Sequence, residues 1–221
     1  MIQTSSAEEN YLKVIYRLSE INEGGISTNS VAEMMQTKAA SVTDMLKKLS
    51  SKGWIDYQKY QGVTLTPSGE KIALNTIRKH RLWETFLVNK LNFQWDEVHD
   101  IAEQLEHIDS SILINKLDEF LDFPKTDPHG DPIPNSAGDM HNRINTLLLE
   151  IQLNQECTLL GVAIDNSIFL KMLTKMGLSL GAKIKILEIN NFDFSRKVLI
   201  NNKKEVFVSS EIAKNIYVKK S

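Results

Sequence analysis

Histidines and acidic residues that can bind a metal ion are concentrated in the middle of this chain. They are His80, Glu84, His99, Glu103, Glu106 and His107. On an α-helix, side chains four residues apart lie on the same face, as do His99 and Glu103. If one helix covers residues 96–107, Glu106 and His107 join them on one stripe. Two imidazoles and two carboxylates on a stripe predict a divalent-cation site, and the alternative is a solvated polar face.

The kinds of donor atom indicate which metal such a site would bind. Imidazole nitrogen together with carboxylate oxygen suits Mn(II) or Fe(II), whereas structural zinc sites usually contain paired cysteines. The chain has a single cysteine, Cys157, which excludes a thiolate cage and an intramolecular disulfide. One cysteine also fits a reducing cytoplasm, and we expect Cys157 to be a small buried apolar residue.

Length and composition indicate a globular protein with more than one hydrophobic core. The 221 residues are 42% hydrophobic and 24% charged, and no apolar run is long enough to span a bilayer. The first residues, MIQTSSAEEN, lack the basic and apolar regions of a secretory signal. We therefore expect a cytoplasmic protein with no membrane partner.

Charge is distributed unevenly along the chain. The net charge of −2 argues against a uniformly basic nucleic-acid binder. Residues 84–139, however, contain thirteen acidic and three basic residues, and a bound divalent cation would relieve their repulsion. Between positions 38 and 59 lysines predominate, which is the part of the first third that can approach phosphate.

The first fifty residues have the pattern of a helix-turn-helix. Apolar residues recur at helical spacing from position 11 to position 21, after a capping box formed by Ser6 and Glu9. A short helix after position 29, a turn at residues 36–38 and a helix over residues 39–51 follow. Two helices joined by such a turn are typical of DNA-binding proteins, whose second helix enters the major groove.

Aromatic and β-branched residues around a polar turn predict a β-hairpin after this motif. Helix-turn-helix plus hairpin is a winged helix, whose wing tip, here residues 59–61, lies along a phosphate backbone. The predicted DNA-binding residues are Thr37, Lys38, Ala39, Ser41, Thr43, Lys47, Lys48 and Lys59. Ser41 and Thr43 can contact base edges, and the lysines should mainly contact phosphates. The alternative is a winged helix that contacts only protein.

Three further helices should carry and pair the metal-binding residues. One begins at Pro67 and continues beyond His80 and Glu84. The second covers residues 96–107, and the third begins at position 110 or 111. Their apolar faces need a partner, so we expect a homodimer interface within residues 85–122.

The segment from 123 to 138 contains four of the five prolines and should be an extended connector. Its Asp127, His129 and Asp131 could reach back to a metal, although Asp and His beside proline also form turns. Beyond the connector, residues 155–221 alternate short apolar runs with turns, and positions 168 to 176 suggest a helix. This part of the chain predicts a small β-barrel that carries one helix.

The chain resembles the diphtheria toxin repressor family in five segments, which are EENYLKVIYRL, SVTDMLKKL, KHRLWE, VHDIAEQLEH and FPKTDPHGDPIP. It is most similar to manganese-responsive members with a C-terminal SH3-like domain, and the resemblance covers nearly the whole chain. The implied fold is mainly α with α+β parts. It comprises a winged helix-turn-helix domain (1–72), a helical metal-binding and dimerisation domain (73–142) and an SH3-like, FeoA-like β-barrel (143–221).

The resemblance also implies function. Such proteins are dimeric bacterial repressors that bind operator DNA with Mn(II) or Fe(II) as corepressor and control metal-uptake genes. One implied metal site combines the first helix with the positions matching Glu103, Glu106 and His107. Iron-type members have cysteine where Glu103 stands, and an oxygen ligand there favours the harder Mn(II).

A second implied site uses the positions matching His80, Glu84 and His99, helped by the connector or the later domain. In related long members the connector often has a cysteine at the position of Asp127. Asp127 is therefore a candidate replacement ligand, and His129 lies two residues beyond it.

The first helix departs from the family pattern at two positions. Asn10 stands where the family usually has aspartate or methionine as a ligand, and Lys13 stands where some manganese-type members have glutamate. A protonated lysine is a poor ligand, which puts a paired-metal site in doubt. Asn10 can still offer its amide oxygen, and Glu9 is the other candidate.

We therefore expect Mn(II) to join the first helix, through Asn10 or Glu9, to the later ligands and so to set the two recognition helices of a dimer one DNA turn apart. A metallohydrolase is the alternative from another class. The chain has no H-E-x-x-H motif, and a helix-turn-helix would then have no role. No enzyme activity and no small-molecule substrate are expected. Within the family, the alternative is an Fe(II)-dependent repressor of iron-uptake genes.

Overall fold

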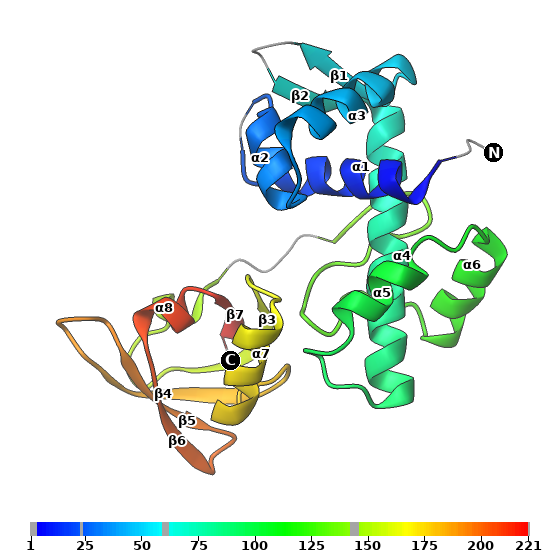
Figure 1. Cartoon of the computed structure of the whole chain (residues 1–221). Helices are drawn as coiled ribbons and strands as arrows, with labels where there is room; N and C mark the ends of the chain where they lie inside the picture. Colours follow the sequence, from blue (N-terminus) through cyan, green and yellow to red (C-terminus); the bar gives the residue numbers. More distant parts are fainter. Residues whose placement is uncertain (1–3, 23, 59–61, 142–145, 221) are drawn as a thin grey trace. The chain divides into compact units, whose positions relative to one another are not determined.

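The amphipathic segments of the sequence form helices in the computed structural model of the chain (Figure 1). The structure describes residues 4–22, 24–58, 62–141 and 146–220. The chain divides into two units that alternate along the sequence. Unit 1 consists of Met1–His80, Gln104–Ser111 and Pro134–Asp139. Unit 2 consists of Arg81–Glu103, Ile112–Ile133 and Met140–Ser221.

Unit 1 contains the helices and the hairpin that the N-terminal sequence predicts. Its helices are α1 (Ser6–Ser19), α2 (Thr28–Met34) and α3 (Ala39–Ser51), and its strands are β1 (Ile55–Gln58) and β2 (Gly62–Leu65). The strands pair antiparallel. In the blue to cyan part of Figure 1, α2 lies against α3, and α3 lies against β1. The predicted wing tip, residues 59–61, lies outside the described residues.

The core of unit 1 explains why α3 has one polar face. Val42, Leu46 and Leu49 are fully buried, as the helical spacing predicts, and they pack in one cluster with Leu12 and Ile15 of α1. The opposite face of α3 is left to polar residues. The apolar repeat of α1 was predicted to continue to position 21, but α1 ends at Ser19 and the side chain at position 21 is exposed.

Three further helices lie in the middle of the chain. They are α4 (Pro67–Leu91), α5 (His99–Leu105) and α6 (Ser111–Phe120). The first part of α4, up to His80, belongs to unit 1, and the part from Arg81 belongs to unit 2. In unit 2, α6 buries Ile114 and Leu117 in one cluster with Leu82 of α4.

Helix α5 is shorter than the sequence predicts. A helix over residues 96–107 was expected, but α5 covers His99–Leu105 and is flanked by turns. Before it, Gln94 and Glu97 form a turn, and Trp95 is buried in the core of the C-terminal sheet. Burial of this indole fixes the chain direction ahead of the helix, so the helix begins only at His99. The helix also ends earlier than expected, at Leu105, so Glu106 and His107 lie beyond its last residue.

The C-terminal part of unit 2 is an antiparallel sheet with helices. The strands are β3 (Glu156–Val162), β4 (Lys183–Ile189), β5 (Arg196–Ile200), β6 (Lys204–Val208) and β7 (Ile216–Lys220). Their order in the sheet is β6-β5-β4-β3-β7. The other elements are a 3-10 turn (Leu148–Glu150), α7 (Ser167–Met176), as predicted, and the short α8 (Ser210–Ala213).

Cys157 of β3 is fully buried in this core, as expected. Burial raises the pKa of its thiol to about 11, with Arg196 opposing the shift, so the thiol stays protonated at neutral pH. Among the residues that the structure describes, no helix has both the length and the hydropathy that crossing a membrane requires.

Candidate metal centres

The start of α1 determines which of two neighbouring glutamates is available for a site. The N-cap is Ser5, whose hydroxyl accepts from the backbone N–H of Glu8, while the Glu8 carboxylate accepts from the backbone N–H of Ser5. The capping box is therefore one residue earlier than the predicted pair Ser6 and Glu9. Glu8 serves the helix end, and Glu9 is turned toward other partners.

Glu8, which is itself buried, also forms ion pairs with two partly exposed lysines, one on α3 and one directly after it. Lys52 Nζ lies 2.6 Å and Lys48 Nζ 3.0 Å from Glu8 Oε1. Burial alone would raise the pKa of Glu8, but hydrogen bonds from Lys52, the Ser5 backbone and Lys48 lower it to about 2. The first turn of α1 is thereby tied to α3 within unit 1.

A second group of charged side chains joins α1 to the residues that follow α5, and we call it the α1 cluster. It consists of Glu9, Lys13, His80, Glu106 and His107. Lys13 Nζ donates to Glu106 Oε1 at 2.6 Å, and His80 Nδ1 lies 2.6 Å from Glu106 Oε2. His107 Nδ1 lies 2.7 Å from Glu9 Oε2. Both carboxylates of the cluster therefore have cationic or imidazole partners.

Glu106 is fully buried and ionised in the α1 cluster. Its burial would raise its pKa, but His80 and Lys13 hold the pKa below its ordinary value. A buried carboxylate is tolerated because its charge is paired and hydrogen-bonded. The ionised Glu106 carboxylate needs a positive charge beside it, and Lys13 supplies that charge in this structure.

The donor atoms of this region fit a divalent metal of intermediate hardness. Within the part of the chain that the structure describes, the side-chain oxygen of Asn10 is buried without a hydrogen-bond partner. Asn10 precedes Lys13 by three residues on α1, so the two side chains lie on one face. Carboxylate, imidazole and amide oxygen donors together suit Mn(II) or Fe(II). The oxygen of Asn10 is therefore a buried acceptor that a bound cation would satisfy.

A second buried group lies in unit 2, and we call it the connector cluster. It consists of Glu84 on α4 and of Asp127 and His129 on the proline-rich connector, with ligand atoms within 4.8 Å of one another. Each of these three residues is at most 4% exposed. His129 Nδ1 lies 3.6 Å from Glu84 Oε2. Three buried ligand types at this separation form a candidate metal site.

Two neighbouring carboxylates make the connector cluster electrostatically different. Burial and the charge of Glu84 raise the pKa of Asp127 to about 6, although Arg81 and His129 oppose this. Burial would lower the pKa of His129, but Glu84 and Asp127 raise it to about 9. The cluster therefore retains protons that a bound cation would replace.

His99 lies at the edge of this cluster. Its Nδ1 lies 3.7 Å from Glu84 Oε1, and its Nε2 lies 3.8 Å from Glu103 Oε1. The side chains of His99 and Glu103 are 37% and 45% exposed. His80 precedes Glu84 by one turn of α4. The predicted ligand Glu103 thus has His99 as its neighbour in unit 2.

The single stripe predicted from the sequence is therefore wrong. Because α5 ends at Leu105, Glu106 and His107 leave the helical stripe and join the α1 cluster. His99 and Glu103 belong to unit 2, where His99 approaches Glu84. The four side chains contribute to two different groups.

The C-terminal sheet domain holds the connector ligands in place. His129 Nε2 lies 2.8 Å from the carbonyl oxygen of Trp95, whose ring stacks on the imidazole, and Trp95 Nε1 donates to Thr174 of α7. Because the pKa of His129 is raised to about 9, the ring carries both protons at neutral pH, so Nε2 donates to this carbonyl and the protonated Nδ1 faces Glu84. The carbonyl oxygen of His129 accepts from Val162 N of β3.

Glycine is required where the connector approaches the sheet. Gly130 has φ +86°, and a Cβ there would collide with the carbonyl oxygen of Leu160. Asp127 Oδ1 accepts from the backbone N–H groups of His129 and Asp131 at 2.8 and 2.9 Å. Asp131, a third metal candidate from the sequence, pairs instead with Arg81.

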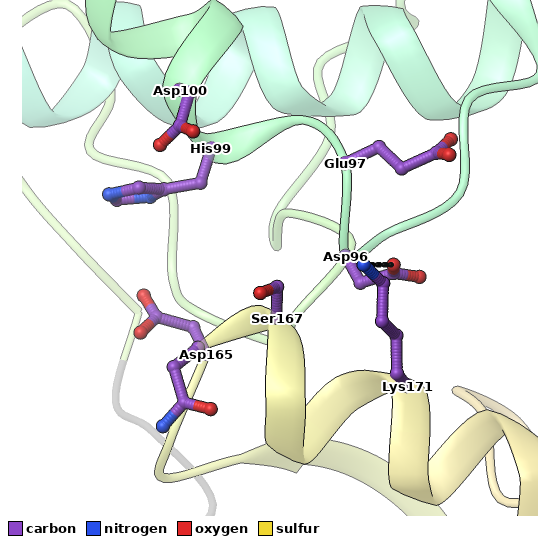
Figure 2. Close-up of a pocket in the computed structure, with 8 residues that line it drawn as sticks. Asp96, Glu97, His99, Asp100, Asp165, Ser167 and Lys171 are labelled. Carbon is purple, nitrogen blue, oxygen red and sulfur yellow. Dashed lines mark ion pairs between the residues drawn. The ribbon is translucent and has the colours of Figure 1, made fainter.

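A cavity of about 460 Å³ opens beside His99 (Figure 2). Asp96, Glu97, His99 and Asp100 line it on one side, and Asp165, Ser167 and Lys171, at the start of α7, line it on the other. Lys171 Nζ lies 3.8 Å from Asp96 Oδ2, which is the ion pair dashed in Figure 2. Glu97, Asp100 and Asp165 supply further carboxylates, and Asn166 and Ser167 are neutral, so the charged groups around His99 favour a cation.

The predicted DNA-binding residues lie just before α3 and along it, with Lys47 and Lys48 in its second half. Thr37, Lys38, Ala39, Ser41 and Lys47 are exposed. Three of the predicted residues have side-chain partners within unit 1, since Thr43 Oγ1 donates to the carbonyl oxygen of Ala39, Lys47 pairs with Asp44 and Lys48 pairs with Glu8. Lys59 lies outside the described residues.

Sequence reasoning does not identify three residues that the clusters use. Lys13 is interpreted only as a poor ligand, although it follows Glu9 by four residues and so shares its face of α1. Arg81, which contacts Asp127 and Asp131, has no distinguishing pattern. Trp95 has a weak signal, because a tryptophan between two helices often marks a packing contact.

Three protein-family models match consecutive parts of the chain. The model described as the iron dependent repressor, N-terminal DNA binding domain, matches residues 3–63, and its metal binding and dimerisation domain matches residues 66–135. A FeoA domain matches residues 146–220. The matched parts together cover most of the chain.

Individual relatives agree with these matches. The HTH-type transcriptional regulator MntR of Oceanobacillus iheyensis is 32% identical over 54% of this chain and 80% of its own length. The iron-dependent repressor IdeR of Mycobacterium leprae is 33% identical over 57% of this chain, and the alignment spans only 54% of that relative. A solved manganese-dependent transcriptional repressor in complex with manganese has a TM-score of 0.83 and 35% identity, covering 97% of this chain and 100% of that one.

Proposed function

Because this chain belongs to the iron-dependent repressor family, which consists of metal-dependent transcriptional repressors of the DtxR/MntR type and not of enzymes, we propose that Mn(II) is its corepressor. In this proposal the protein is a cytoplasmic homodimer that binds operator DNA and controls genes for metal-ion uptake. The observation that carries the proposal is the α1 cluster, in which Glu106 and His107 meet α1 of the same unit. One cation bound by ligands from both segments would link α1 to the residues that follow α5.

The proposed ligands fall into two sets. In the α1 cluster, Glu106 and His107 would bind the ion together with Glu9 or Asn10 of α1. A bound divalent ion supplies a concentrated positive charge that cross-links these donors. Glu106 and Glu9 provide the negative charge, and Asn10 provides the buried oxygen that has no partner in the described part of the chain. Such a cross-link would fix α1, and with it α3, in one arrangement.

In the connector cluster, Glu84, Asp127 and His129 would form the second set. His99, at 3.7 Å from Glu84, would complete it from α5, and His80, one turn before Glu84 on α4, is the remaining candidate. Trp95 and the C-terminal sheet keep His129 oriented toward Glu84. The proposed role of the C-terminal domain is therefore to hold these ligands.

The proposed DNA-binding surface is the exposed start of α3 with the wing. Ser41 is available for base edges, while Lys38 and Lys47 would contact phosphates. Thr43, whose hydroxyl bonds within its own helix, would need to turn to reach a base. Lys48, paired with Glu8, would contribute less than the other lysines.

The proposed domains are a winged helix-turn-helix (1–72), a metal-binding and dimerisation domain (73–142) and an SH3-like barrel (143–221). Exposed apolar side chains on α6 support the dimer, because Ile112 is 77% and Phe120 61% exposed. Apolar groups on one short helix favour burial against a second copy.

A footprinting titration tests the proposal. Protection of promoter DNA should require Mn(II), disappear with a chelator, and be lost when Glu106 and His107 are both changed to alanine. A variant with Lys214, a residue of the C-terminal domain, changed to alanine is the control and should protect like the native chain. If protection of the promoter DNA depends neither on Mn(II) nor on the double change, the proposal is overturned.

Fe(II) is the alternative corepressor, and the similarity to the iron-dependent repressor IdeR supports it. The oxygen and nitrogen donors of both clusters suit either ion. Glu103, which stands where iron-type members have cysteine, remains a proposed ligand in addition to these two sets, so metal-resolved DNA binding by the native chain and by Glu103→Cys should separate the two ions. With Mn(II) as the native corepressor, the cysteine variant shifts the preference toward Fe(II). If Fe(II) activates the native chain better than Mn(II) under anaerobic conditions, the alternative is correct.

A further inference from the structure

Lys13 is a buried cation inside a group of candidate metal ligands. Its side chain is 4% exposed, and the Glu106 side chain that it contacts is 0% exposed. The two are 93 positions apart in the sequence. An ammonium group in such a place needs a negative partner, because an unpaired buried charge is strongly unfavourable.

Lys13 contacts the oxygen that a metal ion would also use. Glu106 Oε1 is 2.6 Å from Lys13 Nζ and 3.7 Å from His107 Nε2, whereas Oε2 is 2.6 Å from His80 Nδ1. An ion bound by both Glu106 and His107 would therefore lie near Oε1. Ion and ammonium would then repel each other at close range in a region with little water.

Both carboxylates of the α1 cluster already have an ammonium group beside them. Glu9 and Glu106 supply two negative charges, and Lys13 and Lys79 supply two positive ones, with Lys79 Nζ 3.6 Å from Glu9 Oε2. A divalent ion bound beside Glu106 would add two positive charges next to these ammonium groups. One of the ammonium groups must then withdraw from its carboxylate.

We propose that Lys13 is a resident competitor of the metal, which holds Glu106 in the metal-free protein and must leave Glu106 Oε1 before an ion can bind there. This inference rests on the proposed function. Lys13 thereby weakens metal binding at the α1 cluster and sets the metal concentration at which the repressor becomes active. Removing the positive charge of Lys13 should tighten metal binding without creating another site.

Direct metal titration tests the inference without DNA. Mn(II) is added to the metal-free full chain, and the remaining free Mn(II) is followed by electron paramagnetic resonance, which gives the affinity and the number of bound ions. Glu106→Ala identifies the binding event that belongs to the α1 cluster. Lys13→Met removes the charge and keeps the length, and Lys13→Gln is a second neutral variant that can still donate a hydrogen bond to Glu106.

The matched control is Lys52→Met. Lys52 pairs with another glutamate of α1, Glu8, at 2.6 Å, is 34% exposed and shares Glu8 with Lys48, so this variant reports the loss of a lysine–glutamate pair of α1 that does not involve Glu106. We expect both neutral variants at position 13 to lower the Kd of the Glu106-dependent event by about tenfold or more, a change typical of residues that adjust metal ligands. Lys52→Met should leave that Kd within about twofold.

The outcomes separate this inference from the proposed function. If Glu106→Ala removes a binding event but a folded Lys13→Gln or Lys13→Met variant binds Mn(II) no more tightly than the native chain, the role of Lys13 is overturned and the repressor remains. If Glu106→Ala removes no binding event at all, the α1 cluster is not a metal site and the proposed function loses its basis.

Discussion

The two candidate metal centres satisfy their buried carboxylates in different ways. In the α1 cluster, Lys13 pairs with Glu106. The pKa of Glu106 is lowered, although its burial alone would raise it. In the connector cluster, two carboxylates lie close together, and the pKa values of Asp127 and His129 are both raised. One centre is neutralised by an ammonium group and the other by protons. A metal ion must therefore compete with a lysine in the first and with protons in the second.

The largest expected effect is on the free energy of unfolding of the metal-free protein when one carboxylate of each centre is changed. Glu106→Gln leaves the ammonium group of Lys13 buried without its carboxylate, and we expect it to lower the free energy of unfolding by about 3–5 kcal/mol. Glu84→Gln should cost less, because it also removes the repulsion between Glu84 and Asp127. Urea denaturation of the two variants at neutral pH, followed by circular dichroism, gives the comparison.

The double variant Lys13→Met with Glu106→Gln is the control for the α1 cluster. It removes both charges and should recover much of the lost stability. Equal losses in the Glu106 and Glu84 variants would show that the two centres do not differ in this way.

The next effect is a pH dependence that belongs to the connector cluster. His129 has a pKa of about 9 in the folded chain and an ordinary value of 6.5, so the folded state binds the extra proton between these values. Its contribution is complete below pH 6.5 and is lost as the pH rises toward 9. The raised pKa of Asp127 acts in the same direction between 3.8 and about 6.

Thermal unfolding of the metal-free chain should therefore show falling stability from pH 6.5 to 9, on the order of 3 kcal/mol at most. In His129→Gln this slope should flatten. An unchanged slope in that variant would place the pH dependence elsewhere in the molecule.

A smaller effect is expected on metal preference. Asp127→Cys introduces a soft ligand into the connector cluster, and it should raise the affinity for Cd(II) by about tenfold, or 1.4 kcal/mol. The cadmium–thiolate absorption band reports this binding directly. The native chain is the blank for this absorption band, because its cysteine, Cys157, is buried in the sheet core and should not bind Cd(II). If Glu106→Ala abolished the new band, the cysteine would be sensing the α1 cluster and the two centres would not be separate.

The smallest effect concerns the support of His129 by the C-terminal domain. Trp95→Phe keeps an aromatic ring but removes the hydrogen bond to Thr174, which contributes about 0.5–1.5 kcal/mol. We expect Mn(II) affinity at the connector cluster to fall a few-fold, with the α1 cluster unaffected. Thr174→Val removes the acceptor of the same hydrogen bond. It should lower the Mn(II) affinity of the connector cluster by the same factor in the same titration. A loss at both clusters would contradict a local role.

The sequence predicts the elements of the N-terminal part well. The helices at residues 28–34 and 39–51 and the strands of the hairpin occur where periodicity and turn residues indicate. These elements bury their own apolar faces within a short stretch of chain, so local pattern and tertiary packing agree. The capping box was misplaced by one residue because Ser5 and Ser6 are both good N-caps, and only the side chain of Glu8 distinguishes them.

The length of α5 was the main error in the fold, and it changed the interpretation of the site. Periodicity alone extends a helix through His107, since Glu103, Glu106 and His107 fit the spacing. The helix ends at Leu105 because the following residues have partners in α1 and α4, such as His107 with Glu9. Contacts between residues nearly a hundred positions apart leave no trace in a local pattern.

By itself, the sequence determined the kinds of ligand and the segments that carry them. Histidine and carboxylate types exclude a thiolate site, the family motifs identify the repressor, and the helical periods place His80 and Glu84 on one helix. Only the tertiary structure decided which ligands meet, that Lys13 lies against Glu106, and that Trp95 and β3 hold His129. The physical reason is that donor chemistry belongs to each residue, whereas burial, charge pairing and pKa depend on neighbours that folding brings together from distant positions.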